Sequence, residues 1–396
     1  IPLGLWNKLN KICQQHNFEI EFEGSSYIKN QDFNEEDFID WVWEFYEGTR
    51  YGKGGDRELR EYQVQACIDT ILYYKSRSEL ATSAGKTIII FTTFAYLKHK
   101  GWINKKMVIV PNTSLVIQTN DDFLEYSEGT VLEDKIKIQM IGGGRSKLKA
   151  DVDVIIGTFQ TLRNLEDEFF DDIDCVCVDE AHHTNAKSIK DIIIKAYDSK
   201  YRYGLSGTMV DDESAEAMTL DAYLGPIVNK ISANFLIHNK FATPIFVKTI
   251  VLNYMEDEIK EKLYELRKRK SPDMDGAKLL DLERKLAIEN KTRFNYVCNL
   301  ISKVSKNTLV LFMDVKNNYG KNVYYQLREL TDDKTIYYVD GGTASDIREE
   351  YKAGMELGNN KILVASFGTF AQGISINNIH HIFFVESYKS DRLIRQ

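Results

Sequence analysis

Short, continuously apolar runs recur along the chain and alternate with longer stretches whose apolar residues return every three or four positions. The short runs predict buried strands, and the longer stretches predict helices. The apolar runs form two series, one over residues 107–111, 152–157, 175–178 and 203–206, and one over residues 308–312, 335–339, 361–365 and 381–385. Strands of this kind, separated by helices, are typical of a parallel sheet covered on both faces. The pattern therefore predicts an α/β protein with two such domains in tandem.

The residues before the first series have helical patterns of their own. One apolar helix face comprises Leu5, Leu9, Ile12 and Cys13, and another comprises Phe38, Ile39, Val42 and Phe45. Residues 51–56 follow as a polar, glycine-rich segment, which favours a linker. We therefore expect residues 1–55 to be part of a small accessory domain with its linker, and residues 56–240 to form the first α/β domain.

The second α/β domain is expected over residues 241–396. Its junction with the first domain is predicted at residues 239–244, and residues 245–252 are predicted to form a strand. A long charged stretch, residues 256–306, predicts two helices that are broken at Ser271-Pro272, because proline disfavours a continuous helix.

The composition is that of a globular protein, and its charge excludes the simplest route to nucleic-acid binding. Of the 396 residues, 43% are hydrophobic and 28% are charged, and the formal net charge is -8. Such a protein has no overall positive field that would attract a polyanion. Contact with a nucleic acid would have to use local basic clusters, of which residues 98–106, 145–149 and 260–270 are candidates.

The cysteines indicate a reducing compartment. No two of the five cysteines have the Cys-x-x-Cys spacing, so we expect free thiols and a cytoplasmic protein. Cys175 and Cys177 lie in an apolar run, and we expect them to pack in the core rather than to bind a metal. No apolar run reaches the roughly 18 residues of a membrane span, so a soluble protein without a membrane partner is predicted.

The segment LATSAGKT, from Leu80 to Thr87, directly precedes an apolar helical stretch. A loop of small residues that ends in Gly-Lys-Thr at a helix N-terminus directs backbone N–H groups and the helix dipole toward a phosphate. Lys86 would then reach the outer phosphates of ATP, and the Thr87 hydroxyl would bind Mg²⁺. Leu80 departs from the strict glycine-first pattern, and Gly-Lys-Thr as the start of an ordinary helix is the alternative.

An acidic pair follows the apolar run at residues 175–178. Residues just beyond the carboxyl end of a parallel strand line the ligand crevice, so Asp179 and Glu180 are expected beside the phosphate loop. Asp179 would bind Mg²⁺, and Glu180 would orient and deprotonate the attacking water. The predicted catalytic residues are Lys86, Asp179, Glu180 and His182, and the predicted metal ligands are Thr87 and Asp179. A solvated acidic turn is the alternative.

Two further segments belong to the same hypothesis. Ser206 and Thr208 end another predicted strand, where hydroxyl groups would sense the state of the acids. Gln63 precedes the phosphate loop, and its amide offers a donor and an acceptor to an adenine edge. The residues predicted to hold the nucleotide are Gln63, Thr82, Ser83, Ala84, Gly85, Lys86 and Thr87.

In chain order, the segments LREYQ, TSAGKT, VPNTSLVIQ, GTFQTL, VDEAHH, LSGT and ASFGTFAQGISI resemble the motifs of superfamily 2 helicases of the DEAH-box type. The phrases IGGGRSK, YYVDGG, GISINNIHHI and PLGLWNKLNKIC are more narrowly similar to the UvsW-type helicases of tailed phages. The likeness runs through nearly the whole chain, and the motifs are highly specific as a set. It implies two RecA-like domains that bind ATP, with DNA lying across both.

The resemblance also assigns residues to the nucleic-acid track. The strand-contact residues that it implies are Pro111, Asn112, Thr113, Gln118, Gly157, Thr158, Gln160 and Ser366. The residues that it implies for coupling ATP to the strand are Ser206, Thr208, Thr369, Gln372 and Gly373. Such contacts are made to the phosphodiester backbone, so an acidic protein can bind DNA without sequence preference. Ser375 departs from the acidic residue that many relatives carry after Gly-Ile, and Ser83 stands where their phosphate loops often have glycine.

Members of the family continue beyond a phrase like that at residues 392–396 into a Gly-Arg-x-x-Arg segment whose arginines contact the γ-phosphate. An arginine finger contributes a factor of roughly a thousand or more to turnover. We therefore expect the native chain to extend past Gln396, and this chain alone to hydrolyse ATP weakly. Ile1 is expected to lie inside the family's small N-terminal domain, which would make that domain partial.

The resulting hypothesis is an ATP-dependent DNA helicase or translocase. It would remodel junctions, forks and R-loops in phage recombination and repair, with RNA as a further partner in hybrids. The alternatives are an RNA helicase of the same superfamily and an ATP-gated DNA clamp that does not unwind. The choice of DNA over RNA rests on the resemblance alone, because backbone contacts carry little sequence information.

Overall fold

The computed structural model of the protein divides into two units, Ile1–Ile245 and Phe246–Arg395. It describes residues 5–19, 29–142, 151–181, 186–207, 214–252, 260–261, 264, 276–313, 315, 317–370 and 376–386. Each unit is built on its own sheet, and in both sheets every pair of neighbouring strands is parallel.

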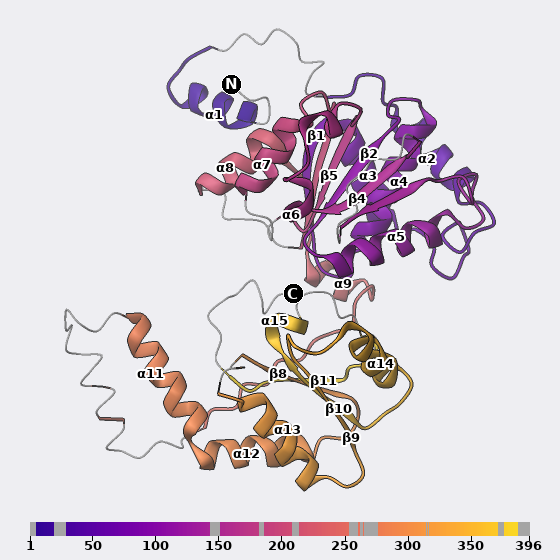
Figure 1. Ribbon diagram of the computed structural model, residues 1–396. Helices are drawn as coiled ribbons and strands as arrows, with labels where there is room; N and C mark the ends of the chain where they lie inside the picture. Colours follow the sequence, from indigo (N-terminus) through magenta and orange to yellow (C-terminus); the bar gives the residue numbers. More distant parts are fainter. Residues whose placement is uncertain are drawn as a thin grey trace. The chain divides into compact units, whose positions relative to one another are not determined.

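The first unit has a seven-stranded sheet with the order β3-β4-β2-β5-β6-β1-β7 (Figure 1). Its strands are β1 (Lys75–Leu80), β2 (Lys106–Val110), β3 (Ile138–Ile141), β4 (Val154–Thr158), β5 (Cys175–Asp179), β6 (Tyr201–Ser206) and β7 (Ile227–Ile231). Its helices are α1 (Trp6–Gln15), α2 (Glu35–Phe45), α3 (Glu61–Leu72), α4 (Lys86–His99), α5 (Thr113–Ser127), α6 (Phe159–Leu162), the 3₁₀ helix η3 (Asp167–Phe170), α7 (Ala186–Lys195), α8 (Ala215–Leu224) and α9 (Ala233–His238).

Two hydrophobic cores cover the two faces of this sheet. Helices α2 to α5 pack on one face, and α7 and α8 pack on the other (Figure 1). The neighbouring residues Met107 and Val108 of β2 are both fully buried but belong to different cores. Successive side chains of a strand point to opposite faces, so a strand buried on both faces is typically a near-continuous apolar run.

The second unit has a four-stranded sheet with the order β11-β8-β10-β9. Its strands are β8 (Thr308–Phe312), β9 (Thr335–Val339), β10 (Lys361–Ser366) and β11 (His381–Phe384). Its helices are α11 (Gly276–Glu289), α12 (Lys291–Ser302), α13 (Tyr319–Leu330), α14 (Ser345–Glu356) and α15 (Phe367–Phe370). Helices α12 and α13 share one core with the sheet, and α14 and α15 share the other.

The predicted α/β class with two helix-flanked parallel sheets is confirmed. All eight strands that the apolar runs predicted are present, within one or two residues of their expected bounds. Strands β1, β3 and β7 were not predicted, and β1 was missed because its sequence, KSRSEL, is polar. Arg77 at its centre is only 2% exposed, and its guanidinium pairs with Asp221 and donates to the Gly225 carbonyl at 2.9 Å.

Two elements of the second half differ from their predictions. Residues 245–252 form no strand, and Phe246, Val247 and Val251 are about nine-tenths exposed, at 92%, 88% and 90%. Within the part of the chain that the structure describes, these mostly apolar residues have no neighbouring strand, and an isolated strand is not stable by itself. The stretch after the predicted break forms two helices instead of one, α11 and α12, and Asn290 between them caps α12. The break predicted at Ser271-Pro272 and most of the helix predicted before it lie outside the described residues.

Helix α2 packs against α4 through aromatic rings. The Phe38 and Trp41 rings contact Tyr96 edge-on, with centroids 4.9 and 5.0 Å apart. The hydroxyls of Tyr46 and Thr92 form a hydrogen bond of 2.8 Å. The structure thus places residues 35–55 in the first unit, where the sequence pattern predicted a separate segment. The hydrophobic pattern identifies an apolar face but not the helix that covers it.

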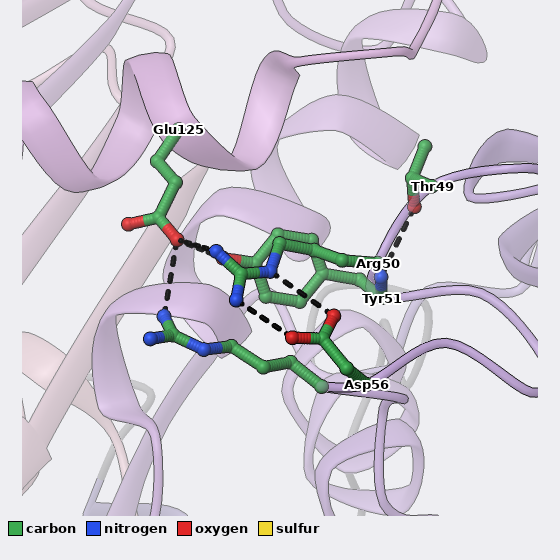
Figure 2. Close-up of polar contacts among 6 residues, drawn as sticks. Thr49, Arg50, Tyr51, Asp56 and Glu125 are labelled. Atoms are coloured by element: carbon green, nitrogen blue, oxygen red, sulfur yellow. Dashed lines mark hydrogen bonds and ion pairs between the residues drawn. The ribbon is translucent and has the colours of Figure 1, made fainter.

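The segment at residues 51–56 is a packed turn and not a linker (Figure 2). Glu125 Oε1 accepts hydrogen bonds from Tyr51 Oη at 2.8 Å, from Arg50 Nη1 at 3.0 Å and from Arg57 Nη1 at 3.0 Å. Arg50 also donates to Asp56 through Nε at 3.3 Å and Nη2 at 2.8 Å. Burial and the hydrogen bond to Glu125 raise the pKa of Tyr51 to about 12. We call these five residues the Glu125 cluster; it ties the turn to α5.

The cysteine prediction is confirmed where the structure tests it. Cys175 and Cys177 are 0% and 1% exposed in the first core, and burial raises the pKa of their thiols to about 11 and about 12. Among the helices of the described residues, none combines the length and the apolar character that a bilayer crossing requires.

Candidate nucleotide site

The phosphate loop connects the end of β1 to the start of α4 and turns through two left-handed residues. Ser83 has φ 69° and Gly85 has φ 81°, and the loop is closed by a hydrogen bond of 3.0 Å from Ala84 N to the Ala81 carbonyl. Successive N–H groups in such a turn form a concave site for an anion. Lys86 and Thr87 are the first two residues of α4, where the helix dipole favours negative charge. The loop therefore has the geometry of a phosphate site.

The two side chains that support this loop come from α3. Tyr62 Oη and Gln63 Nε2 both donate to the Ala84 carbonyl, each at 3.0 Å. Gln63 Oε1 accepts from Arg60 N at 3.0 Å, which completes the start of α3. The Gln63 amide, predicted to bind an adenine edge, is 7% exposed and has both of its polar atoms engaged inside the protein. In this structure it holds the loop.

The acidic pair lies beside the loop because β5, β6 and β1 are neighbours in the sheet. Asp179 is the last residue of β5 and is 8% exposed. Glu180 has φ 51°, a conformation that is rare for residues other than glycine. Its carboxylate forms an ion pair of 2.7 Å between Oε1 and Lys86 Nζ. The structure thus brings Lys86, Asp179 and Glu180 together, as the sequence predicted.

The site carries more negative than positive charge. Burial and the neighbouring Glu180 charge raise the pKa of Asp179 to about 6, although Lys86 opposes the shift. Burial by itself lowers the pKa of Lys86, but Glu180 and Asp179 outweigh it, and the net shift is upward. Asp122 of α5 adds a third carboxylate, whose pKa is raised to about 6 by burial and by Glu125. Three carboxylates and one ammonium favour a bound divalent cation.

The donor set is compatible with Mg²⁺ if phosphate oxygens and water complete it. The described residues hold no cluster of three or more His, Cys, Asp or Glu side chains that could bind a metal by themselves. Mg²⁺ is commonly bound through one or two carboxylates plus substrate phosphates and waters. The Thr87 hydroxyl and the Asp179 carboxylate are hard oxygen donors of the required kind.

A cavity of about 1080 Å³ opens next to the loop within the first unit. Its lining includes Ser83 and Gly85 of the loop, Tyr62 and Gln63 of α3, Tyr51 and Arg57 of the Glu125 cluster, and the rings of Tyr126, Phe235 and Phe241. Aromatic rings beside polar groups suit the base and ribose of a nucleotide. The cavity is therefore the natural place for the rest of a nucleotide whose phosphates lie on the loop.

The predicted coupling residues are only partly within the described chain. Ser206 ends β6, is 0% exposed, and lies opposite Glu79 of β1 in the sheet register. It thus lies between the strand that carries the loop and the strand that carries the acids. The predicted residues His182, Thr208, Gln372 and Gly373 lie outside the described residues.

The predicted strand-contact residues of the first unit gather at one edge of its sheet. Val110 and Thr158 are paired in the register of β2 and β4, so the segments that follow them are adjacent. Gln160 Nε2 donates to the Pro111 carbonyl at 3.4 Å and joins the two segments. Pro111 is half-buried beside exposed Thr113 and Gln118.

Besides Gln160, three of the predicted strand-contact residues in the first unit have structural roles. The Asn112 side chain accepts from Leu115 N at 2.9 Å and caps α5. The Thr158 side chain accepts from Thr161 N at 3.4 Å and caps α6. A Cβ on Gly157 would lie 3.0 Å from the Leu162 side chain, so glycine is explained there by close packing. Exposed Thr113, Gln118 and Gln160 are the side chains available to a strand.

In the second unit, the predicted strand-contact residue Ser366 meets the predicted coupling residue Thr369. Their hydroxyl groups are hydrogen-bonded at 2.7 Å, and the two residues are 5% and 7% exposed. Ser366 ends β10, at the carboxyl edge of the second sheet. Its hydroxyl is thus directed to Thr369 and not to solvent in this structure.

Three side chains that shape the site were not predicted from the sequence. Tyr62 supports the loop, Asp122 adds charge beside Thr87, and Glu125 anchors the turn at the cavity. Asp122 and Glu125 lie one helix turn apart on α5, at the i, i+3 spacing that puts two residues on one face. That spacing was the available signal, but it did not identify which face meets the phosphate loop.

Comparison with known proteins shows what this chain is similar to. Residues 56–211 match the family described as the type III restriction enzyme, res subunit. The ATP-dependent DNA helicase UvsW of Enterobacteria phage T4 is 28% identical over 404 residues, covering 100% of this chain and 75% of that protein.

Solved structures agree on the fold. The crystal structure of T4 UvsW is similar with a TM-score of 0.50 at 24% identity, covering 100% of this chain and 74% of that one. The DUF1998 helicase MrfA, solved bound to DNA, has a TM-score of 0.59 at 13% identity, covering 85% of this chain and 46% of that one. The resemblance inferred from the motifs is therefore confirmed: the chain is similar along its whole length to the UvsW helicase of phage T4.

Proposed function

We propose that this protein is an ATP-dependent DNA helicase or translocase that remodels branched DNA during phage recombination and repair. The single observation that carries the proposal is the 2.7 Å ion pair between Lys86 at the start of α4 and Glu180 beyond β5. It joins the two halves of a phosphate-hydrolysing site in a chain whose relative, T4 UvsW, is named an ATP-dependent DNA helicase. A phage-encoded protein of this kind would act in the host cytoplasm.

The chemistry follows from the positions of these two residues. Bound phosphates would compete with Glu180 for Lys86, since the ammonium forms its ion pair with that carboxylate in the structure. Once released, Glu180 is positioned to accept a proton from the water that attacks the γ-phosphate. Bound Mg²⁺, held by Thr87 and Asp179, would supply charge neutralisation at the phosphates. Lys86 thus changes partner as nucleotide binds, and that exchange frees the base.

The nucleic-acid strand would be bound through hydroxyl, amide and backbone groups. Thr113, Gln118 and Gln160 are exposed at one edge of the first sheet, and none of them carries charge. Neutral donors of this type contact the phosphodiester backbone and do not read base sequence. We infer that the protein follows DNA without sequence preference, and that opening and closing linked to ATP turnover moves the strand.

The proposal predicts which nucleic acid stimulates the enzyme. We expect ATP turnover by the full-length protein to rise at least about tenfold with forked or junction DNA, by analogy with other substrate-gated ATPases, and to rise less with single-stranded RNA of equal length. Steady-state phosphate release with each polymer at saturation measures this. Stimulation by RNA that equals or exceeds that by DNA would identify an RNA helicase. Turnover that DNA leaves unchanged would contradict the proposal.

A further inference from the structure

A basic hollow of about 580 Å³ lies at the amino-terminal edge of the second sheet. The turns before β8, β9, β10 and β11 and the end of α12 form its walls, and we call it the amino-edge hollow. Three lysines and a histidine line it, Lys303, Lys306, Lys334 and His380, against one carboxylate, Asp333. In a chain with a net charge of -8, this local excess of positive charge needs an explanation.

One of the lysines has a structural role, and two do not. Lys334 Nζ donates to the carbonyls of Ser302 at 2.7 Å and Val304 at 2.5 Å, and so caps the end of α12. Lys303 and Lys306 are exposed, and within the described part of the chain neither has a carboxylate at ion-pair distance. Two cations are therefore directed to solvent at the hollow.

The shape of the hollow is fixed by one buried side chain. Asn307 is 0% exposed, and its Nδ2 donates to the carbonyls of Met355 at 2.8 Å and Gly358 at 2.6 Å. Its Oδ1 accepts from Lys361 N at 2.9 Å, and its backbone carbonyl accepts from His380 N at 3.0 Å. Through its side chain and its backbone carbonyl, Asn307 thus joins three of the turns. The hollow is therefore formed before any ligand arrives.

The turns also hold two residues in a costly backbone conformation. Lys306 has φ 77° and Asn360 has φ 62°, and both line the hollow. A residue other than glycine stays in this region only where its surroundings determine it, at a cost of about 1–3 kcal/mol. Asn360 Nδ2 donates to Asp333 Oδ2 at 3.1 Å and so occupies one oxygen of the carboxylate that, among the described residues, lines the hollow. The geometry keeps Lys306 in place and directs part of Asp333 toward Asn360.

We propose that the amino-edge hollow is a second nucleic-acid contact site, which binds the phosphodiester backbone of an arm other than the translocated strand. Strand β10 runs from Lys361 at the hollow to Ser366 at the predicted strand-contact edge. At about 3.3 Å per residue these edges are roughly 17 Å apart, so one phosphate cannot serve both. A protein that remodels branched DNA must hold more than one arm, and in this respect the inference rests on the proposed function.

A polymer fits the hollow better than a small anion does. The two available lysines are exposed, and an exposed ammonium binds one phosphate ion weakly because water competes for it. A nucleic-acid arm presents a row of phosphates and releases condensed counterions when lysines neutralise them. Binding through Lys303 and Lys306 should therefore depend steeply on salt and be specific for substrates with an additional arm.

The test compares the full-length protein with a Lys303→Gln/Lys306→Gln double variant. Affinity for a four-way junction and for a plain single strand is measured by fluorescence anisotropy over a series of salt concentrations. We expect junction affinity to fall roughly tenfold at low salt, and the slope of log affinity against log salt to decrease by about 2, since each phosphate contact contributes about 0.9. Single-strand affinity and basal ATP turnover should be unchanged.

Matched variants distinguish a specific effect of the amino-edge hollow on junction binding from a general effect of removing positive charge. Lys291→Gln/Lys321→Gln removes the same charge from exposed positions of the second unit and should leave junction binding unchanged. Lys303→Arg/Lys306→Arg should retain it. Equal losses on the junction and the single strand, or a loss no larger than that of the Lys291/Lys321 control, would overturn the inference. The proposed function would survive such a result, because it is tested separately by the stimulation of ATP turnover by DNA and by strand displacement.

Discussion

Replacing Glu180 with glutamine is expected to lower ATP turnover by about 100-fold or more, because general-base catalysis typically contributes a factor of 10² to 10⁴. The amide keeps the size of the side chain but cannot accept the proton of the attacking water. ATP affinity should be retained or increase, since Lys86 would lose the carboxylate with which it forms an ion pair at 2.7 Å. Phosphate release and equilibrium ATP binding, measured on the same full-length preparation, separate the two effects.

The control is Glu168→Gln, which makes the same chemical change at an exposed position. It should leave both turnover and affinity unchanged. Turnover by Glu180→Gln at the wild-type rate would refute the assignment of the base. A loss of ATP affinity in that variant would contradict the proposed exchange of partners at Lys86.

Gly85→Ala is expected to disable the phosphate loop. Gly85 has φ 81°, and an added Cβ would lie 2.3 Å from Gln63 Nε2. The left-handed backbone costs alanine about 1–2 kcal/mol, and displacing Gln63 would leave its buried amide unpaired at about 1–3 kcal/mol more. We expect a lower free energy of unfolding and an ATP affinity reduced at least about tenfold, in line with that sum.

Two variants test the cause of that effect by chemical denaturation and nucleotide titration. Gly142→Ala adds the same methyl group where nothing lies within 4 Å, and it should have little effect. Ser83→Gly relieves the left-handed conformation at φ 69° and should stabilise the protein by up to about 1 kcal/mol. If Gly85→Ala bound ATP as tightly as Gly142→Ala did, the account of the loop would be wrong.

The sequence was sufficient to predict the strands whose buried positions carry apolar residues. Strands such as β2 and β10 are buried on both faces and carry four consecutive apolar residues, so the pattern is unambiguous. Strand β1 is buried as well, but Arg77 at its centre is satisfied by Asp221, far away in the chain. No local pattern reveals such a partner. The opposite error was made for the exposed residues 245–252, which were predicted as a strand because they are mostly apolar. An apolar segment without a neighbouring strand does not form a sheet.

The same limit applies to the site. Sequence order and spacing placed Lys86, Asp179 and Glu180 together, because the carboxyl ends of neighbouring parallel strands meet at one edge. They could not show that Gln63 holds the phosphate loop, since its hydrogen bond to the Ala84 carbonyl depends on how α3 lies beside the loop. Nor could they show that the turn at residues 51–56 is fixed by Glu125, which is distant in sequence.

The central claim is that ATP hydrolysis at Lys86 and Glu180 drives the remodelling of branched DNA. The most direct measurement is strand displacement from a labelled DNA fork by the full-length protein, followed with ATP and with a non-hydrolysable analogue. The account predicts displacement with ATP and none with the analogue. Displacement at equal rates with both nucleotides, or none with ATP while the fork stimulates hydrolysis, would contradict it.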